Sequence, residues 1–180
     1  MVAYFWQGRL VRLRAVEPSD ADAHFTWDQD ADMERRLDRV HVPRSRAITR
    51  QWAERASVQD PDDDNVHFEI ETLAGEFVGS VSVHNRDQRS GTFELGIAIL
   101  DAQRRRGYAS DAISLVLRYY FEELRYQKLT VRVYAFNEPS LHLFERLGFQ
   151  HEGRLRRMVY TQGRFFDVVL LGLTKEEFVG

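Results

Sequence analysis

Three consecutive arginines followed by a glycine, at residues 104–107, form the group in this chain best suited to hold an anion. The mainly apolar run 94–100 precedes them, and a helical pattern opens at Ser110. The first backbone N–H groups of a helix lack partners within the helix and carry partial positive charge, so they attract phosphate. Gly107 lets the main chain approach an anion closely, and Ala109 leaves the first turn uncrowded. This pattern predicts a phosphate or pyrophosphate site made of Arg104, Arg105, Arg106, Gly107, Tyr108 and Ala109.

A solvated arginine loop with an ordinary turn glycine is the alternative interpretation of the same residues. The chain has no Gly-x-x-x-x-Gly-Lys-[Ser/Thr] motif and no dinucleotide-binding glycine pattern, which disfavours ATP and NAD. Its six histidines lack the spacing of a metal-binding pair, and no Gly-x-Ser-x-Gly nucleophile elbow occurs. We therefore expect pyrophosphate binding without a metal.

A second segment, Asn137–Phe149, follows a strand-like run and has the pattern Asn-x-x-Ser-x-x-Leu-Phe-x-x-x-Gly-Phe. Together with the upstream Arg104-x-x-Gly107-x-Ala109, it resembles the GNAT-type N-acetyltransferases. The segments 10–14, 93–99 and 152–167 further resemble the branch that holds RimJ/RimL-like and spermidine-acetyltransferase-like proteins. The resemblance covers residues 8–175, except that 28–65, where this family builds its acceptor pocket, matches no pattern.

The resemblance implies one α/β domain over residues 1–180. Its mixed central sheet would be splayed between the fourth and fifth strands, with helices on both faces. The co-substrate would be acetyl-CoA, whose pantetheine arm would pair with the main chain of Ile97 and Ile99. The pyrophosphate would rest on the amides of 104–109.

The same resemblance assigns further positions around the cofactor. Asn137 would hydrogen-bond the cofactor, and Phe144 stands among the cofactor-binding positions, where many relatives carry tyrosine. A bulge in the strand 94–100 would leave one amide near Ile99 unpaired and aimed at the thioester oxygen, as the oxyanion donor.

Acyl transfer from a thioester to an amine needs a neutral amine, an oxyanion donor and a proton for the departing sulfur. Because the chain has no cysteine, direct attack in a ternary complex is expected. Glu94 is the expected base, directly or through water, since a carboxylate in an apolar strand is costly without a purpose. Strand alternation puts it on the face of Gly96 and Ala98, whose small side chains leave space. The alternative is a carboxylate that faces water or pairs with an arginine.

The proton donor to sulfur is less clearly marked, because Phe144 has no hydroxyl. Ser140 is the nearest hydroxyl within the motif and is the candidate acid, and it is equally suited to be a helix N-cap beside Pro139. Tyr134 and Tyr160 are further candidates.

The segment 35–46 is rich in arginine, which argues against a polyamine acceptor and for a protein N-terminal amine or an acidic amine metabolite. The alternative is that nearby acids at 28, 30, 32 and 34 neutralise these arginines in surface pairs. A small-molecule amine (antibiotic, polyamine or metabolite) remains a second acceptor class. A non-catalytic acyl-CoA-binding module remains a third reading, because a fold does not fix a function.

Hydrophobic periodicity predicts the elements that must position these residues. Strands are expected at 10–16, 66–72, 77–83, 92–100, 129–135, 149–160 and 166–173. Helices are expected from Pro18, within 28–40, and at 43–57, 110–124 and 139–147. The helix 43–57 should bury Ile48, Trp52 and Ala56, and the acidic stretch Asp60–Asn65 should be a solvated turn.

The composition sets broad limits. The 180 residues are 43% hydrophobic, enough for one well-buried domain, and carry a net charge of −3, which disfavours general nucleic-acid binding. The N-terminus lacks a signal-peptide pattern and no run is long enough to cross a bilayer. The expected protein is cytoplasmic, without nucleic-acid or membrane partners, and a homodimer formed through its final hairpin, as in many relatives.

Overall fold

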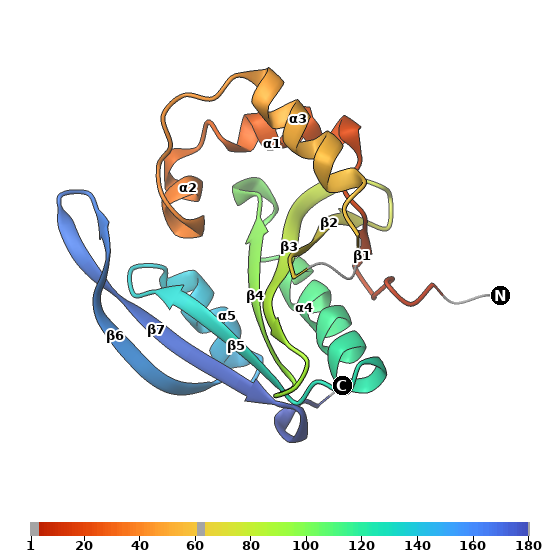
Figure 1. Cartoon of the computed structure of the whole chain (residues 1–180), viewed down its shortest axis with the longest axis vertical. Helices are drawn as coiled ribbons and strands as arrows, with labels where there is room; N and C mark the ends of the chain where they lie inside the picture. Colours follow the sequence, from red (N-terminus) through yellow and green to blue (C-terminus); the bar gives the residue numbers. More distant parts are fainter. Residues whose placement is uncertain (1–3, 61–63, 180) are drawn as a thin grey trace. The chain divides into compact units, whose positions relative to one another are not determined.

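The computed structural model describes residues 4–60 and 64–179 (Figure 1). The strands are β1 Val11–Arg14, β2 Val66–Thr72, β3 Phe77–Asp87, β4 Thr92–Ile99, β5 Lys128–Tyr134, β6 Gln150–Thr161 and β7 Arg164–Thr174. The helices are α1 Ala21–Trp27, α2 Ala31–Leu37, α3 Arg46–Ser57, α4 Tyr108–Arg118 and α5 Glu138–Arg146. None of the helices in the described residues has the length and apolarity that crossing a membrane requires.

The strands form one mixed sheet in the order β1-β2-β3-β4-β5-β7-β6, in which β4 and β5 run parallel. The β4–β5 register covers only three pairs, from Thr92↔Lys128 to Glu94↔Thr130. In contrast, β5 pairs with β7 along its whole length. The predicted mixed α/β sheet, with its fourth and fifth strands joined only at their starts, is confirmed.

The chain folds as two compact units, which are described separately. The first comprises residues 1–82 and 97–112, and the second comprises 83–96 and 113–180.

In the first unit, α1 and α3 pack around Val16, Ala21 and Ala53, with Trp52 and Ala56 at the margin. The predicted start of α3 at Pro43 is three residues early, because the Ser45 hydroxyl accepts from the Ile48 amide and caps the helix at Arg46. Ile48 itself is half exposed, so its predicted burial is wrong, and Thr49 and Ala53 fill the buried positions instead.

Also in the first unit, β1 and β2 carry a buried ionic network. Arg14 donates to both Asp20 and Glu71, and Arg12 also pairs with Glu71. Asp20 and Glu71 are each 7% exposed, so these guanidinium groups are what make their burial tolerable. The network ties the start of α1 to the two strands.

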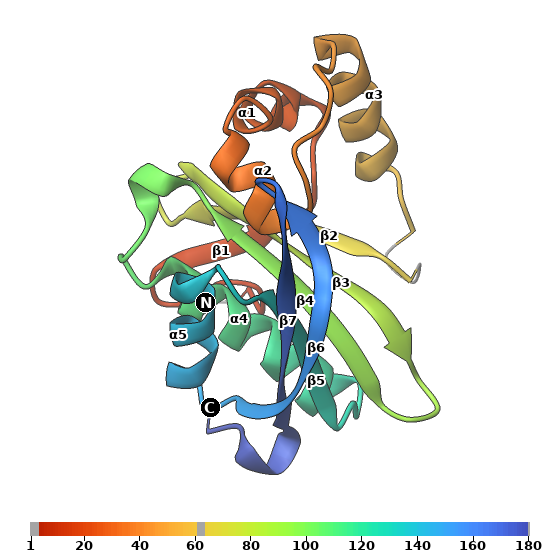
Figure 2. The ribbon, with the colours of Figure 1, turned by 90° about the vertical axis from the view of Figure 1, so that its left-hand side faces the viewer.

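In the second unit, the alternating pattern of β4 and β5 buries Phe93, Leu129, Val131 and Val133 on one face. Phe93 stacks on Tyr120 with ring centroids 4.4 Å apart, where α4 continues into a π-helical turn, Tyr119–Glu123. Figures 1 and 2 show α5 against one face of β5 and β7. Glu94 and Thr130 lie on the opposite face of the strands.

The remaining predicted elements are confirmed with small shifts of their ends. β3 runs four residues past the predicted end at Val83, and α4 begins at Tyr108 rather than Ser110. The predicted acidic turn 60–65 cannot be compared in full, because residues 61–63 lie outside the described residues.

Candidate functional site

The first turn of α4 is held in place by the Asp111 carboxylate, which sequence reasoning missed. Its two oxygens accept hydrogen bonds from the backbone amides of Arg9, Leu10 and Val11, at 3.3, 2.8 and 3.0 Å. Gly8 makes this approach possible, because a Cβ there would lie 2.4 Å from an Asp111 oxygen. The segment before β1 is thereby fastened to the start of α4.

The turn before α4 has the backbone shape of an anion cradle. Arg105 and Gly107 both adopt left-handed conformations, with φ of 63° and 86°, so the turn 104–107 folds tightly before the helix begins. Gly107 is constrained further, since a Cβ would lie 3.0 Å from Leu10. Within residues 4–60 and 64–179, no backbone carbonyl outside regular helices and strands accepts from the amides of 105–109. The amides are therefore available to an anion.

The three arginines of the turn do not share one role. Arg104 is half-buried, forms a 2.8 Å ion pair with Asp101, and donates to the Ile99 carbonyl at 3.3 Å. Burial lowers the pKa of Arg104, and the Asp101 charge opposes that shift. Arg105 and Arg106 are exposed. Arg104 thus fixes the turn onto the end of β4, and the next two side chains face solvent.

The end of β4 is the stretch expected to pair with pantetheine. Ala98 is buried against Trp27 and Met33, so its small side chain does not leave open space there. The Leu100 amide donates to the Val78 carbonyl at 2.9 Å. The unpaired bulge amide near Ile99 stays a prediction, as does cofactor contact at Ile97.

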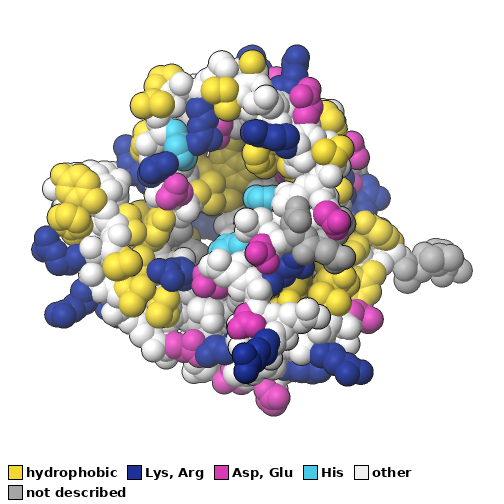
Figure 3. Space-filling view, in the orientation of Figure 1, with side chains coloured by type: hydrophobic (Ala, Val, Ile, Leu, Met, Phe, Trp, Pro, Cys, Tyr) yellow, Lys and Arg dark blue, Asp and Glu magenta, His cyan; other side chains and the backbone are white. Residues whose placement is uncertain are grey.

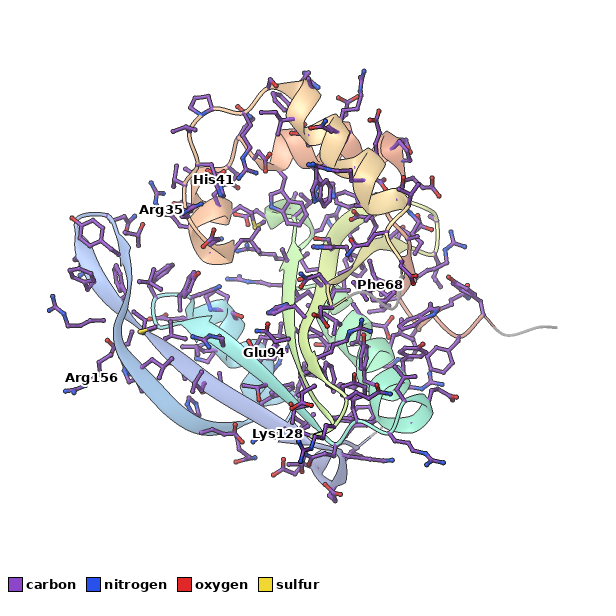
Figure 4. All side chains as sticks on the ribbon, in the orientation of Figure 1. Arg35, His41, Phe68, Glu94, Lys128 and Arg156 are labelled. Atoms are coloured by element: carbon purple, nitrogen blue, oxygen red, sulfur yellow. The ribbon has the colours of Figure 1, made fainter. Side chains whose placement is uncertain are left out.

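In the second unit, Glu94 lies on the polar face of β4, as strand alternation predicts, and its side chain is 20% exposed. Figure 4 labels its position on β4. The side chain beside it is His84 of β3, with Nε2 3.8 Å from Oε2, and the two form an ion pair only when His84 is protonated. Within the described residues, Glu94 therefore has a histidine beside it and no arginine in an ion pair with it.

The Asn137 segment begins α5. Asn137 is the residue before the helix, and its carbonyl accepts from the amides of Ser140 and Leu141 at 3.0 and 3.1 Å. The suggestion that Ser140 caps the helix is wrong, because Ser140 lies inside the first turn, where its half-buried hydroxyl has no capping role. Phe144 is 3% exposed and packs on Phe149 with ring centroids 5.0 Å apart. Contact of Asn137 or Phe144 with a cofactor stays a prediction.

The arginine-rich segment of the first unit proves to be charge-balanced. Residues 28–46 contain five acids and five arginines. Arg35 pairs with Asp32 at 2.8 Å, and Arg44 approaches Asp28 at 3.8 Å. The other contacts are Arg36 with Asp101, Arg46 with Asp22, and Glu34 with His41, which Figure 4 shows beside α2. The alternative of neutralised surface arginines is the one that the structure supports.

A second histidine–carboxylate pair joins α1 to β2 in the first unit. His24 Nε2 is 2.8 Å from Glu69 Oε1, and the His24 ring packs against Trp27 and Trp52. Glu69 is 1% exposed, and its second oxygen has no hydrogen-bond partner in the described structure. No cluster of three or more potential metal-ligating side chains occurs in the described residues.

The final hairpin ends in exposed apolar and basic side chains. Met158, Tyr160 and Phe165 are half exposed or more, and Arg157 lies over the Phe165 ring. Figure 3 shows hydrophobic side chains gathered at the end of this hairpin beside basic ones. Such a surface is typical of a contact region.

Comparisons with known proteins cover most of the chain. A sequence model of the acetyltransferase (GNAT) domain matches residues 10–150. The chain is 35% identical to the SPbeta prophage-derived uncharacterized N-acetyltransferase YokL of Bacillus subtilis, over 99% of this chain and 97% of that protein. It is 33% identical to the putative ribosomal N-acetyltransferase YdaF of the same organism, over 59% of this chain and 58% of that protein.

Solved structures share the fold. The spermidine N-acetyltransferase of Vibrio cholerae, in complex with CoA and spermine, superposes with a TM-score of 0.81 at 21% identity, over 94% of this chain and 98% of that one. A putative acetyltransferase from T. thermophilus gives a TM-score of 0.80 at 28% identity, over 98% of this chain and 93% of that one.

Proposed function

Because the chain belongs to the GNAT family of N-acetyltransferases, we propose that it transfers the acetyl group of acetyl-CoA to the α-amine of a protein N-terminus. Attack is direct, in a ternary complex. The observation that carries the proposal is the Glu94 carboxylate, which lies on the polar face of β4 and pairs there with a histidine instead of an arginine. A small-molecule amine is the alternative acceptor.

Each group of cofactor-binding residues has a proposed role. The amides of 105–109, with Arg105 and Arg106, take the pyrophosphate, while Arg104 holds the turn against the end of β4. The main chain of Ile97 and Ile99 pairs with the pantetheine arm. Asn137 and Phe144 are assigned to cofactor binding by the resemblance to the family.

The proposed chemistry is proton transfer combined with approximation. Glu94 accepts the proton of the ammonium group, directly or through water, so that the neutral nitrogen attacks the thioester carbon. The amide near Ile99 donates to the developing oxyanion. The C–S bond then breaks, the Ser140 hydroxyl protonates the departing thiolate, and Ser140 regains its proton from the attacking nitrogen, which becomes the amide nitrogen of the product.

The charge balance of the first unit supports the proposed acceptor class. A polyamine carries several positive charges and needs carboxylates that are not already neutralised. Around α1 and α2, the acids at 22, 28, 32 and 34 all contact arginine or histidine. This pairing favours an acceptor with a single amine, and the similarity to a putative ribosomal N-acetyltransferase points the same way.

The test is CoA release in the presence of acetyl-CoA and a panel of peptides with free N-termini, spermidine, aminoglycosides and amino acids. We expect turnover on peptides, and about a 100-fold lower kcat in Glu94→Gln. Ser140→Ala should lower kcat without weakening acetyl-CoA binding. Binding of acetyl-CoA with no turnover on any amine would instead support a non-catalytic module.

A cytoplasmic location and a homodimer formed through β6 and β7 complete the proposal. The support for the dimer is the exposed apolar end of the hairpin. Sedimentation of wild type and of Tyr160→Arg would test it, since a charge in that contact should give monomers.

A further inference from the structure

Glu94 has a titratable neighbour on the adjacent strand. His84, on β3, places Nε2 3.8 Å from Glu94 Oε2, and the two side chains are 33% and 20% exposed. Both side chains are therefore partly buried and partly in contact with water. A carboxylate that collects protons at each turnover must pass them on, and an imidazole is the side chain best suited to do so near neutral pH.

The backbone of β3 is shaped so that His84, and not an arginine, meets Glu94. In a regular strand, residues 84 and 86 would share one face. Asn85 between them adopts φ of 51°, a left-handed conformation that is uncommon outside glycine. The Arg86 guanidinium is turned away and hydrogen-bonded to Tyr120. Because Tyr120 stacks on Phe93, it marks the face opposite Glu94.

This irregularity has a chemical consequence. A permanent guanidinium beside Glu94 would hold the carboxylate ionised and weaken it as a base. A histidine in that position can gain and lose a proton during turnover. Irregularities of this kind often re-aim side chains next to active sites.

Several of the charged groups on the strands beside the pair already have ion-pair partners. On β5, Thr130 lies opposite Glu94, and Lys128 is bonded to Glu152 at 2.5 Å. Arg132 lies on the same face and is exposed. On β2, which adjoins β3 in the sheet order, the titratable residues are His67, Glu69 and Glu71, of which Glu69 pairs with His24 and Glu71 with Arg12 and Arg14.

We propose that His84 is a positioning and proton-relay residue that acts through Glu94. The acceptor ammonium gives a proton to the Glu94 carboxylate, and the protonated carboxyl passes it through one bridging water to the neutral His84 imidazole, because the 3.8 Å between the two side chains is longer than a direct hydrogen bond. The imidazolium releases it to solvent, so both groups return to their starting states. This inference rests on the proposed function, because it assigns the exit of the proton from that reaction.

The test compares His84→Gln with wild type in the CoA-release assay across pH. We expect kcat to fall about tenfold, with KM for the amine unchanged. The step in the pH–rate profile that a titrating histidine produces should disappear. Added imidazole should restore kcat of the variant in proportion to its concentration, because a soluble base replaces the missing relay, while wild type does not respond.

The matched control is His151→Gln. His151 also pairs with a carboxylate in the second unit, Glu145 at 2.9 Å, and its loss should change neither kcat nor the pH profile. A His84→Gln variant with the kcat and pH profile of wild type would overturn the relay. In that case, turnover by the wild-type protein would still support the proposed function. A slower variant that imidazole does not rescue would also overturn the relay. Absence of wild-type turnover on every amine would refute the function itself.

Discussion

Asp111 offers the sharpest test of how the turn before α4 is held. Its Oδ2 atom accepts from the amides of Leu10 and Val11, and Oδ1 accepts a longer bond from Arg9. Asp111→Ala removes all three bonds. A hydrogen bond to a charged group contributes about 1.5–3 kcal/mol, but the amides of Arg9 and Leu10 are exposed and regain water. We therefore expect a loss of about 3 kcal/mol, or roughly 6–12 °C in Tm.

The geometry also ranks a second substitution. Asp111→Asn can place its single oxygen at the Oδ2 position and keep two of the bonds, but they become neutral and about half as strong. The expected loss is about 1–1.5 kcal/mol. Urea unfolding of wild type and both variants measures the ranking.

The control is Asp32→Ala. Asp32 is also an acid in the first turn of a helix, but it is exposed and its ion pair with Arg35 stays within α2. Its loss should cost under about 0.5 kcal/mol. An Asp111→Ala protein as stable as this control, or an Asn variant less stable than the Ala variant, would refute the reasoning.

Two further substitutions test the turn and the ionic network. Gly107→Ala should destabilise the fold by about 1–2 kcal/mol and weaken acetyl-CoA binding measured by calorimetry, because Gly107 has φ of 86° and Leu10 lies against it. Burial acts to raise the pKa of Asp20, but hydrogen bonds from Arg14 and the Glu17 amide outweigh it and lower that pKa. Such a carboxyl stabilises the fold above its unfolded pKa, so urea stability should fall as pH drops below about 4. Arg14→Met should cost about 3 kcal/mol at pH 7, because it leaves the buried Asp20 carboxylate without a guanidinium and Glu71 with that of Arg12 alone.

The sequence was most informative where local patterns decide structure. Period-two alternation put Phe93 in the core and Glu94 on the polar face, because strand geometry alone fixes which residues share a face. The strand, basic turn and helix around Arg104–Ala109 were also predicted correctly as elements. The resemblance to the acetyltransferases rested on the same segments.

What the sequence did not reveal depends on partners far apart in the chain. Asp111 meets the amides of residues 9–11 across about a hundred positions, and no local pattern marks that contact. The sequence marked His84 only as one of six histidines without metal-pair spacing, because the left-handed Asn85 beside it is visible only in the backbone. The buried face of the helix 46–57 shifted by one residue for a similar reason: packing against Val16 and Ala21 selected Ala53 over the more apolar Ile48.

The arginines of 35–46 show how charge patterns mislead. As a sequence, they predict a basic surface that would attract anions. In the structure, acids before and after them in the chain fold back to meet them, so the surface is close to neutral. Only the pairing geometry distinguishes the two cases.

The most direct test of the central claim is mass spectrometry of a mixture of acetyl-CoA, spermidine and a lysine-containing peptide with a free N-terminus, incubated with wild type or Glu94→Gln. We expect one acetyl group on the peptide α-amine with wild type, and very little with the variant. Acetylation of spermidine in preference to the peptide would contradict the proposed acceptor. Equal product from wild type and Glu94→Gln would contradict the role of Glu94, on which the account depends.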